Sequence, residues 1–323
     1  MTGHSWLHPG AQVGSWVAKW ASKWASALAL WLLLALTWVL AHLPRSFIPY
    51  LGDLGGLLFY QLSRRRRSIA LDNIQKAKES GALPSDLDAA YTAKKSFKNL
   101  GRTAVESFCL LHRGFDYFKG CCQFEGLTEP VPAIVESTKE TGRGVIFLTA
   151  HSGNWEISPA AVSVRFNFKV SVVGRSQGHI ADQILSRIRS QGGGEFIYKD
   201  GGARTMLTLL KNGGFLGTLF DQAAVVGSNI AELTFMGRPA MTTLGPVRLA
   251  AKTGAAVVPF FCRREGRRHI FEFVAPIFPP QGNDREWLNQ SAQKLNDQLA
   301  DFIRRYPDQW MWSHRRWKMP DHH

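Results

Sequence analysis

A histidine and a glutamate that could do acid–base chemistry stand five residues apart in the stretch HSGNWE, residues 151–156. This stretch directly follows the apolar run GVIFLTA, in which one threonine is the only polar side chain. A neutral imidazole with a carboxylate on one ring nitrogen is oriented to accept a proton on the other. Ser152 is the only serine or cysteine beside this pair, and no nucleophile is obvious there. The pair therefore indicates a general base, His151, oriented by Glu156 and acting on a hydroxyl that the substrate brings.

Residues five apart in a helix point about 140° away from each other, so the two side chains can meet only across a turn. We predict a strand at 145–150, with His151 in the loop after it and Glu156 in the first turn of the next helix. Asn154 is a good N-cap for that helix, and Ser158 followed by Pro159 is an alternative start. Ligands of open α/β sheets bind at the carboxyl ends of strands. The same pair could also serve only to close a helix-start turn.

Short apolar runs alternate with helical stretches over the rest of the chain. We expect strands at 145–150, 169–174, 195–198, 215–220, 255–262 and 269–277, and helices at 178–191, 201–212, 242–253 and 284–306. Residues 64–140 carry apolar side chains at three- and four-residue spacing and are expected to be helical. Apolar strands that alternate with helices predict an α/β fold, with a mixed, mostly parallel sheet covered by helices.

The twenty residues 24–43 carry no Lys, Arg, Asp or Glu. A helix needs about 20 apolar residues to cross the hydrocarbon core of a membrane, and tryptophan and lysine precede this run as they do at membrane interfaces. We therefore predict an interfacial segment and hydrophobic membrane-anchor helix at 1–43 and a catalytic domain at 44–323. A buried helix of a soluble domain, and a segment within 24–62 that re-enters the membrane instead of spanning it once, remain alternatives.

The chain is strongly basic, with 39 Lys and Arg against 25 Asp and Glu and a formal net charge of +14. Such an excess favours an anionic partner. We expect no nucleic acid, because none of the usual recognition modules occurs and the tryptophans are concentrated near the two ends of the chain. The four cysteines lack zinc-site spacing and an H-E-x-x-H motif is absent, so we expect neither a metal nor another cofactor.

Several blocks taken together resemble the late acyltransferases of lipid A biosynthesis, the lauroyl- and myristoyltransferases within the H-x4-D/E glycerolipid acyltransferase superfamily. The resemblance covers roughly residues 28–318. Its blocks are HSGNWE, VVGR ending at Arg175, DQ at 221–222, FMGRPA at 235–240, TGAAVVPFFCRREG at 253–266 and QWMWSHRRWK at 309–318. The chain departs from the commoner superfamily pattern in having Glu156 in place of aspartate, and DQAAVVG in place of a PEG phosphate block.

The resemblance implies transfer of a fatty acyl chain from acyl carrier protein to a hydroxyl of a lipid A precursor at the bacterial inner membrane, on its cytoplasmic side. His151 would be the base and Glu156 its orienting partner. Residues implied to bind substrates are Asn154, Arg175, Asp221, Gln222, Arg238, Arg315 and Arg316.

Alternatives stay open at this point. Arg175 could form a surface salt bridge, and Asp221 with Gln222 could form an ordinary strand-to-loop turn. The acceptor could be another membrane glycolipid or an aminolipid, and the protein could be a non-catalytic basic membrane-binding protein.

Overall fold

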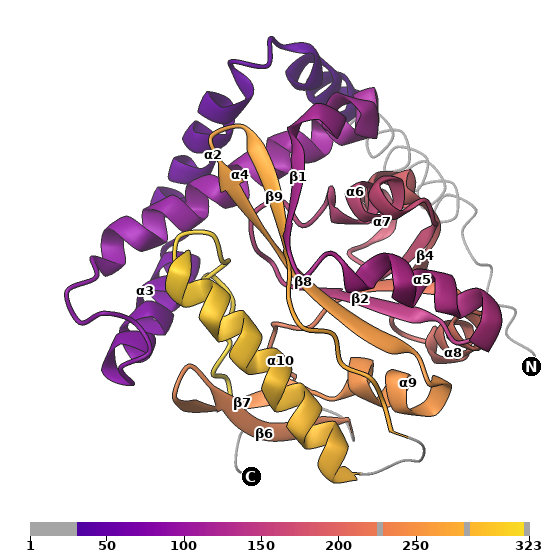
Figure 1. Ribbon diagram of the computed structural model, residues 1–323. Helices are drawn as coiled ribbons and strands as arrows, with labels where there is room; N and C mark the ends of the chain where they lie inside the picture. Colours follow the sequence, from indigo (N-terminus) through magenta and orange to yellow (C-terminus); the bar gives the residue numbers. More distant parts are fainter. Residues whose placement is uncertain (1–30, 225–228, 281–284, 320–323) are drawn as a thin grey trace, which may run out of the picture.

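A seven-stranded sheet forms the centre of the computed structural model, which describes residues 31–224, 229–280 and 285–319 (Figure 1). The strand order is β1-β9-β8-β2-β5-β3-β4. The strands are β1 (Cys122–Gly126), β2 (Val145–Thr149), β3 (Val170–Gly174), β4 (Gly193–Tyr198), β5 (Phe215–Leu219), β8 (Ala256–Glu265) and β9 (Arg268–Phe273). Of the neighbouring pairs in this sheet, β8 with β9 is antiparallel and the others are parallel, which confirms the mixed, mostly parallel sheet.

Helices cover both faces of this sheet, and each face has its own hydrophobic core. On one face lie α5 (Pro130–Thr141), α6 (Ser158–Phe166) and α7 (His179–Arg189). On the other lie α8 (Ala203–Lys211), α9 (Gly245–Thr253) and α10 (Arg285–Arg305). Because β2 lies between β5 and β8 and is covered on both faces, all five of its residues are buried, and its sequence VIFLT is apolar except for the final threonine.

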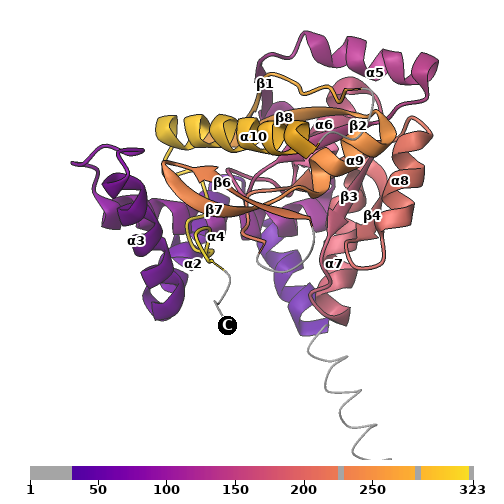
Figure 2. The same ribbon diagram turned by 90° about the horizontal axis from the view of Figure 1, so that it is seen from below.

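Three further helices, α2 (Ile48–Leu62), α3 (Arg64–Glu79) and α4 (Ala89–Arg113), form a layer at one end of the sheet (Figure 2). α4 crosses the carboxyl ends of β2 and β8, and its N-terminus is capped by Asp88, whose side chain accepts two backbone N–H groups. α2 lies very close to α4, since a Cβ added to Gly101 would come within 2.1 Å of the Gly52 carbonyl oxygen. The helical layer is therefore fixed against the end of the sheet where the HSGNWE loop emerges.

Three strands were not predicted from the sequence. β1 interrupts the stretch 64–140, which was expected to be helical throughout, because this five-residue edge strand is too exposed to show an apolar run. The hairpin of β6 (Ile230–Phe235) and β7 (Arg238–Thr243) packs against α10. Its turn needs positive φ at two positions, which Met236 and Gly237 provide.

The proposed membrane anchor lies partly outside the described residues, since 24–30 are not among them. Residues 31–42 are helical, and within the described part of the chain no helix combines the length and the apolar character needed to cross a membrane. The anchor at 24–43 thus stays a prediction. Large apolar side chains are nevertheless exposed at Trp31, Leu32, Leu36, Trp38, Tyr50, Leu54, Leu58 and Leu62.

Candidate active site

His151 lies in the loop after β2, as the sequence predicts, and its imidazole is held by Asp221 at the end of the neighbouring strand β5. The distance from Nδ1 of His151 to Oδ1 of Asp221 is 2.8 Å, and the backbone N–H of His151 donates to Oδ2 at 3.1 Å. An ionised carboxylate can only accept, so Nδ1 carries the hydrogen and Nε2 is left as a proton acceptor. Nε2 lies 3.4 Å from the amide nitrogen of Gln222.

Glu156 was expected to orient His151, and the structure gives it a different partner. Both of its oxygens accept from Arg189, at 2.7 and 2.9 Å, and Oε1 also accepts from Nε1 of Trp155 at 2.9 Å. The reason is topological, because β5 brings Asp221 directly beside β2 while the turn after His151 directs Glu156 toward the last turn of α7. The carboxylate that binds the His151 ring is therefore that of Asp221.

Asp221 is buried, and three groups compensate for its lost hydration. Burial alone would raise the pKa of Asp221, but the charge and hydrogen bond of His151, together with His314 and Trp310, hold that pKa well below its usual range. Nε1 of Trp310 donates to Oδ2 at 2.9 Å. The ring of His314 lies against the Asp221 backbone carbonyl, and burial lowers the pKa of His314 to about 4, so this ring is neutral at neutral pH.

The C-terminal block 309–316 runs alongside the HSGNWE loop and fixes its backbone. The backbone N–H of Met311 donates to the His151 carbonyl at 2.9 Å, and that of Gly153 donates to the Gln309 carbonyl at 3.0 Å. Ser152 and Trp310 form an antiparallel bridge. Two segments from distant parts of the sequence therefore form one unit around His151 and Asp221.

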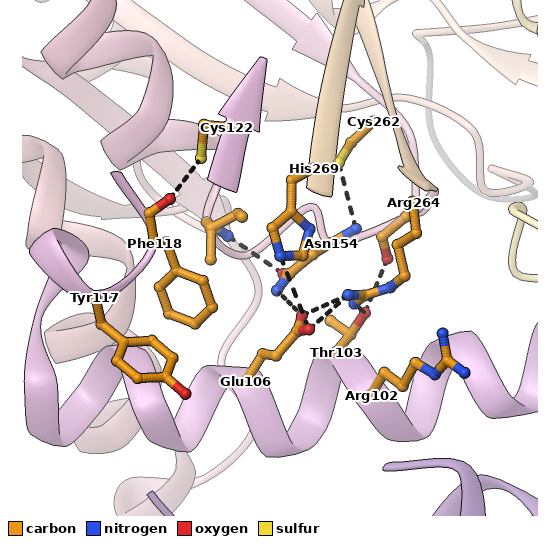
Figure 3. A network of polar contacts seen from close by, with 12 residues as sticks. Arg102, Thr103, Glu106, Tyr117, Phe118, Cys122, Asn154, Cys262, Arg264 and His269 are labelled. Atoms are coloured by element: carbon orange, nitrogen blue, oxygen red, sulfur yellow. Dashed lines mark hydrogen bonds and ion pairs between the residues drawn. The ribbon is translucent and has the colours of Figure 1, made fainter. Parts of the chain in front are cut away.

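A buried polar network holds the other side of this loop against α4 (Figure 3). Nδ2 of Asn154 donates to Glu106 at 2.7 Å, while Oδ1 of Asn154 accepts the N–H groups of Glu156 and Ile157. Glu106 also accepts from Arg264 at 2.7 Å. Arg264 donates in addition to Thr103, whose hydroxyl donates to the carbonyl of Gly153 in the loop.

The Glu106–Arg264 ion pair is the charged centre of that network. Burial would raise the pKa of Glu106, but the charge of Arg264, with His269 and the Asn154 amide, lowers it, so the carboxylate stays ionised. The Asn154 side chain is completely buried and engaged, so the expected substrate-binding role of Asn154 is wrong. Asn154 caps the turn, and α6 itself begins at Ser158 with Pro159 next, close to the alternative start.

Two cavities meet at the Glu156–Arg189 pair. The larger, of about 500 Å³, is lined by His151, Arg175 and Gln222, so these three predicted site residues share one wall. The second is a narrow slot of about 40 Å³ between the sheet and α6. Its walls are mainly apolar and include Phe147, Val162, Val170, Val172, Gly217 and Phe260.

The three remaining predicted site residues lie elsewhere. Arg238 forms an ion pair with Glu79 of α3 at 3.5 Å and is not in the wall of the large cavity. Arg316 is fully buried and donates to the Met241 carbonyl, Thr242 and Asn296. The expected substrate-binding role of Arg316 is therefore wrong, whereas its neighbour Arg315 is exposed and its role stays a prediction.

Sequence reasoning missed Arg189 and Trp310, which hold the carboxylates of Glu156 and Asp221. The signal for Arg189 is weak, because an arginine in the last turn of a helix is common on any surface. Trp310 belongs to the C-terminal block, but its indole N–H partner can be found only from the fold. Within the described residues, no group of three or more His, Cys, Asp or Glu side chains could hold a metal ion.

A protein-family model described as bacterial lipid A biosynthesis acyltransferase matches residues 18–319. The chain belongs to this family.

Individual relatives are distant. The lipid A biosynthesis lauroyltransferase of Escherichia coli K12 is 24% identical over 297 residues, which is 89% of this chain and 90% of that protein. The phosphatidylinositol mannoside acyltransferase of Mycobacterium tuberculosis H37Rv is 26% identical over 186 residues, 57% of each chain, so the match spans little more than half of that relative. The lipid A biosynthesis acyltransferase of Haemophilus influenzae is 21% identical over 178 residues, 55% of each chain.

Replacing Asp221 by asparagine tests the role of the carboxylate in this acyltransferase-family protein. Oδ2 accepts two N–H groups, from the His151 backbone and Trp310, so the amide oxygen of the introduced asparagine must occupy that position. The amide NH2 then donates to Nδ1 and moves the imidazole hydrogen to Nε2, which can no longer accept a proton. We expect Asp221→Asn to lower kcat by about 10²–10⁴-fold with little change in KM.

Asp72→Asn, an exposed aspartate of α3, is the matched control for this loss of one negative charge. Circular dichroism checks that both variants are folded. If folded Asp221→Asn keeps more than about a tenth of wild-type kcat, the orienting role of Asp221 is wrong.

Replacing Glu106 by glutamine tests the network behind the loop. Arg264, whose side chain is 4% exposed, would be left as a buried charge without a counterion. Breaking one side of such a pair typically costs about 3–5 kcal/mol, so Glu106→Gln should lower the free energy of unfolding by that order. The double variant Glu106→Gln/Arg264→Met removes both charges and should therefore recover a large part of the lost free energy of unfolding.

Denaturant unfolding in detergent measures these differences. Glu136→Gln, which breaks an exposed pair with Lys139, should change stability by less than about 0.5 kcal/mol. An equal effect of Glu106→Gln and Glu136→Gln would show that the buried pair does not support the loop.

Proposed function

We propose that the protein transfers a fatty acyl chain from an acyl carrier protein thioester to a hydroxyl of a lipid A precursor. The observation that carries this proposal is the His151–Asp221 pair at the wall of a large cavity that adjoins a narrow apolar slot. Membership of the lipid A acyltransferase family supports the reaction class and the glycolipid acceptor. The pair supplies a base but no nucleophile, which suits direct attack by an acceptor hydroxyl.

In this mechanism Nε2 of His151 takes the proton of the acceptor hydroxyl as its oxygen attacks the thioester carbonyl carbon. The tetrahedral intermediate then collapses, the carbon–sulfur bond breaks, and the proton passes from the imidazolium to the leaving thiolate. Asp221 stabilises the transient imidazolium through Nδ1. We assign the developing oxyanion to Arg189, whose guanidinium is held by Glu156 where the two cavities meet.

The apolar slot is suited to the acyl chain. It runs from the Glu156–Arg189 pair along the face of the sheet, between β2, β5 and β3 on one side and α6 on the other. Placing the chain there brings the thioester carbonyl beside Arg189 and within reach of His151. The slot would have to widen to admit a long chain, so the side chains that line it are expected to limit the chain length.

The overall charge supports an acidic carrier protein as donor. The net charge of +14 would accelerate association with a negatively charged protein at low salt. Arg315 is exposed and suited to such a contact.

The exposed apolar side chains of residues 31–42 and α2 support an attachment to the inner membrane, with the catalytic domain on its cytoplasmic side. A shallow groove between Leu33 and α7 shares Gln177 and Leu185 with the large cavity, and Figure 2 shows the first described helix beside α7. A lipid acceptor could therefore reach His151 from the membrane surface along a continuous path. An anchor at 24–43 would complete this arrangement.

A second candidate acceptor is a phosphatidylinositol mannoside, the substrate class in the name of the relative from Mycobacterium tuberculosis. Transfer to an acceptor of this kind would use the same base and the same slot. The two candidates would differ only in how the acceptor fits the large cavity.

Reconstitution tests the proposed reaction. Purified protein in detergent, given acyl carrier protein thioester and a lipid A precursor, should produce a product heavier by one acyl group in mass spectrometry. His151→Ala should lower the rate by about 10²–10⁴-fold. Lipid A from a strain without the protein should lack one acyl chain. Transfer to phosphatidylinositol mannoside alone would favour the second candidate, and equal rates with acyl-coenzyme A without salt dependence would count against the carrier protein.

Two substitutions in the slot should shift the acyl chain length in opposite directions. A Cβ on Gly217 would lie 2.9 Å from a methyl carbon of Val170, so Gly217→Ala narrows the slot and should favour shorter chains. Val162→Ala removes two methyl groups from the opposite wall and should favour longer ones. Products from a mixture of donors of different length are compared by mass spectrometry. Val131→Ala, buried in α5 outside the slot, is the control, and an unchanged distribution in both slot variants would refute this assignment.

A further inference from the structure

Two cations follow adjacent strands at the edge of the sheet that carries His151. Arg175 directly follows β3, and Lys199 directly follows β4. The register pairs Gly174 with Tyr198, and the backbone N–H of Lys199 donates to the Gly174 carbonyl at 2.8 Å. Both side chains line the large cavity. The fold thus places side by side, in one wall, two positive charges that are well separated in the sequence.

The two carboxylates in this wall already have partners. Glu156 is bound by Arg189, and Asp221 is bound by His151. Neither Arg175 nor Lys199 forms an ion pair with a carboxylate of the described chain. Asp200 interacts with Lys199 only through space, and the pKa of Lys199 is lowered by lost hydration and then by the charge of Arg175. An anion between the two cations would relieve this repulsion.

We propose that Arg175 and Lys199 form an anion subsite that binds a phosphate ester carried by one of the two substrates. A phosphate has enough oxygens to accept from both cations at once, and arginine in particular matches its geometry. The identity of the substrate that carries the phosphate rests on the proposed acyl transfer. The binding of an anion to the subsite can be measured separately.

The position of the subsite separates it from the bond that reacts. The strand order β2-β5-β3-β4 puts Arg175 two strands and Lys199 three strands away from His151. Neighbouring strands are about 4.8 Å apart, so the anion lies roughly 10 Å or more to the side of the base. Arg175 therefore positions a substrate group at a distance, and the charge that develops on the reacting carbonyl is left to Arg189.

A phosphate at this distance could come from either substrate. A phosphorylated glycolipid would bring it on the sugar, and a carrier protein would bring it as the phosphodiester of its pantetheine arm. Both sources share the same chemistry. If the acceptor carries the phosphate, the KM for the acceptor depends on the two cations. If the carrier protein carries it, the KM for the donor does.

Direct binding provides the first test, and it does not depend on the acyl-transfer reaction. Glucose 1-phosphate is titrated into the full-length protein in detergent and followed by calorimetry, with glucose as the neutral probe. The double variant Arg175→Gln/Lys199→Gln should bind the sugar phosphate roughly 10–100-fold more weakly than the wild type. Lys211→Gln/Lys252→Gln loses the same charge at the ends of α8 and α9, outside the cavity wall, and should bind like the wild type.

Kinetics provides the second test and identifies the source of the phosphate. If the double variant Arg175→Gln/Lys199→Gln has a higher KM for the phosphorylated acceptor but an unchanged KM for the dephosphorylated acceptor, the phosphate belongs to the acceptor. If the double variant instead has a higher KM for acyl carrier protein but an unchanged KM for acyl-pantetheine, which has no phosphate, the phosphate belongs to the donor. Both results support the subsite.

Equal binding of the sugar phosphate by the wild type, the double variant and the control variant overturns the subsite. The subsite is also overturned if the double variant changes KM equally for phosphorylated and phosphate-free substrates. If the wild type binds the sugar phosphate through these cations but transfers no acyl chain to any acceptor, the subsite stands and the proposed function fails.

Discussion

The carboxylate of Asp221 has to stay ionised although it is buried, and the arrangement around the site follows from that requirement. A carboxylate without water needs hydrogen-bond donors from fixed positions. Here the backbone and ring of His151 provide two, and the indole of Trp310 provides a third. Because Trp310 belongs to the C-terminal block, that block must return across the sheet for the imidazole to be oriented. The terminal residues are thus part of the site, although they contribute no group that faces the cavity except Met311.

The loop from His151 to Glu156 is held by buried charges on several sides. Glu106 and Glu156 each face an arginine, Arg264 and Arg189 respectively, and in both carboxylates these hydrogen bonds and charges outweigh the effect of burial on the pKa. An ion pair of this kind contributes little net stability compared with apolar residues of the same size. It does fix direction, since a bidentate arginine holds its carboxylate in one orientation. We therefore interpret the two pairs as devices that set the geometry of the loop.

The sequence predicts the fold class and the place of the base, because both depend on local patterns. The apolar run before His151 indicates a central strand, and the turn residues after it indicate a loop at its carboxyl end. The partner of His151 could not be predicted in the same way. Spacing favoured Glu156, whereas the neighbour of β2 in the sheet is β5, which lies 70 residues later and brings Asp221. The burial of Arg316 could not be predicted either, because the basic cluster that contains it holds both an exposed and a fully buried arginine.

The same edge of the sheet carries, at separate places, the two groups of residues on which the proposed acyl transfer depends. The ends of β2 and β5 carry the His151–Asp221 pair, in which Asp221 is buried and both of its carboxylate oxygens accept hydrogen bonds. The ends of β3 and β4 carry Arg175 and Lys199, which are exposed and bonded to no other side chain of the described residues. Substitutions at the second pair cost little stability, because exposed side chains without partners contribute little to it. A family built on this sheet can therefore keep one reaction while its acceptors differ, in accordance with relatives named for lipid A and for phosphatidylinositol mannosides.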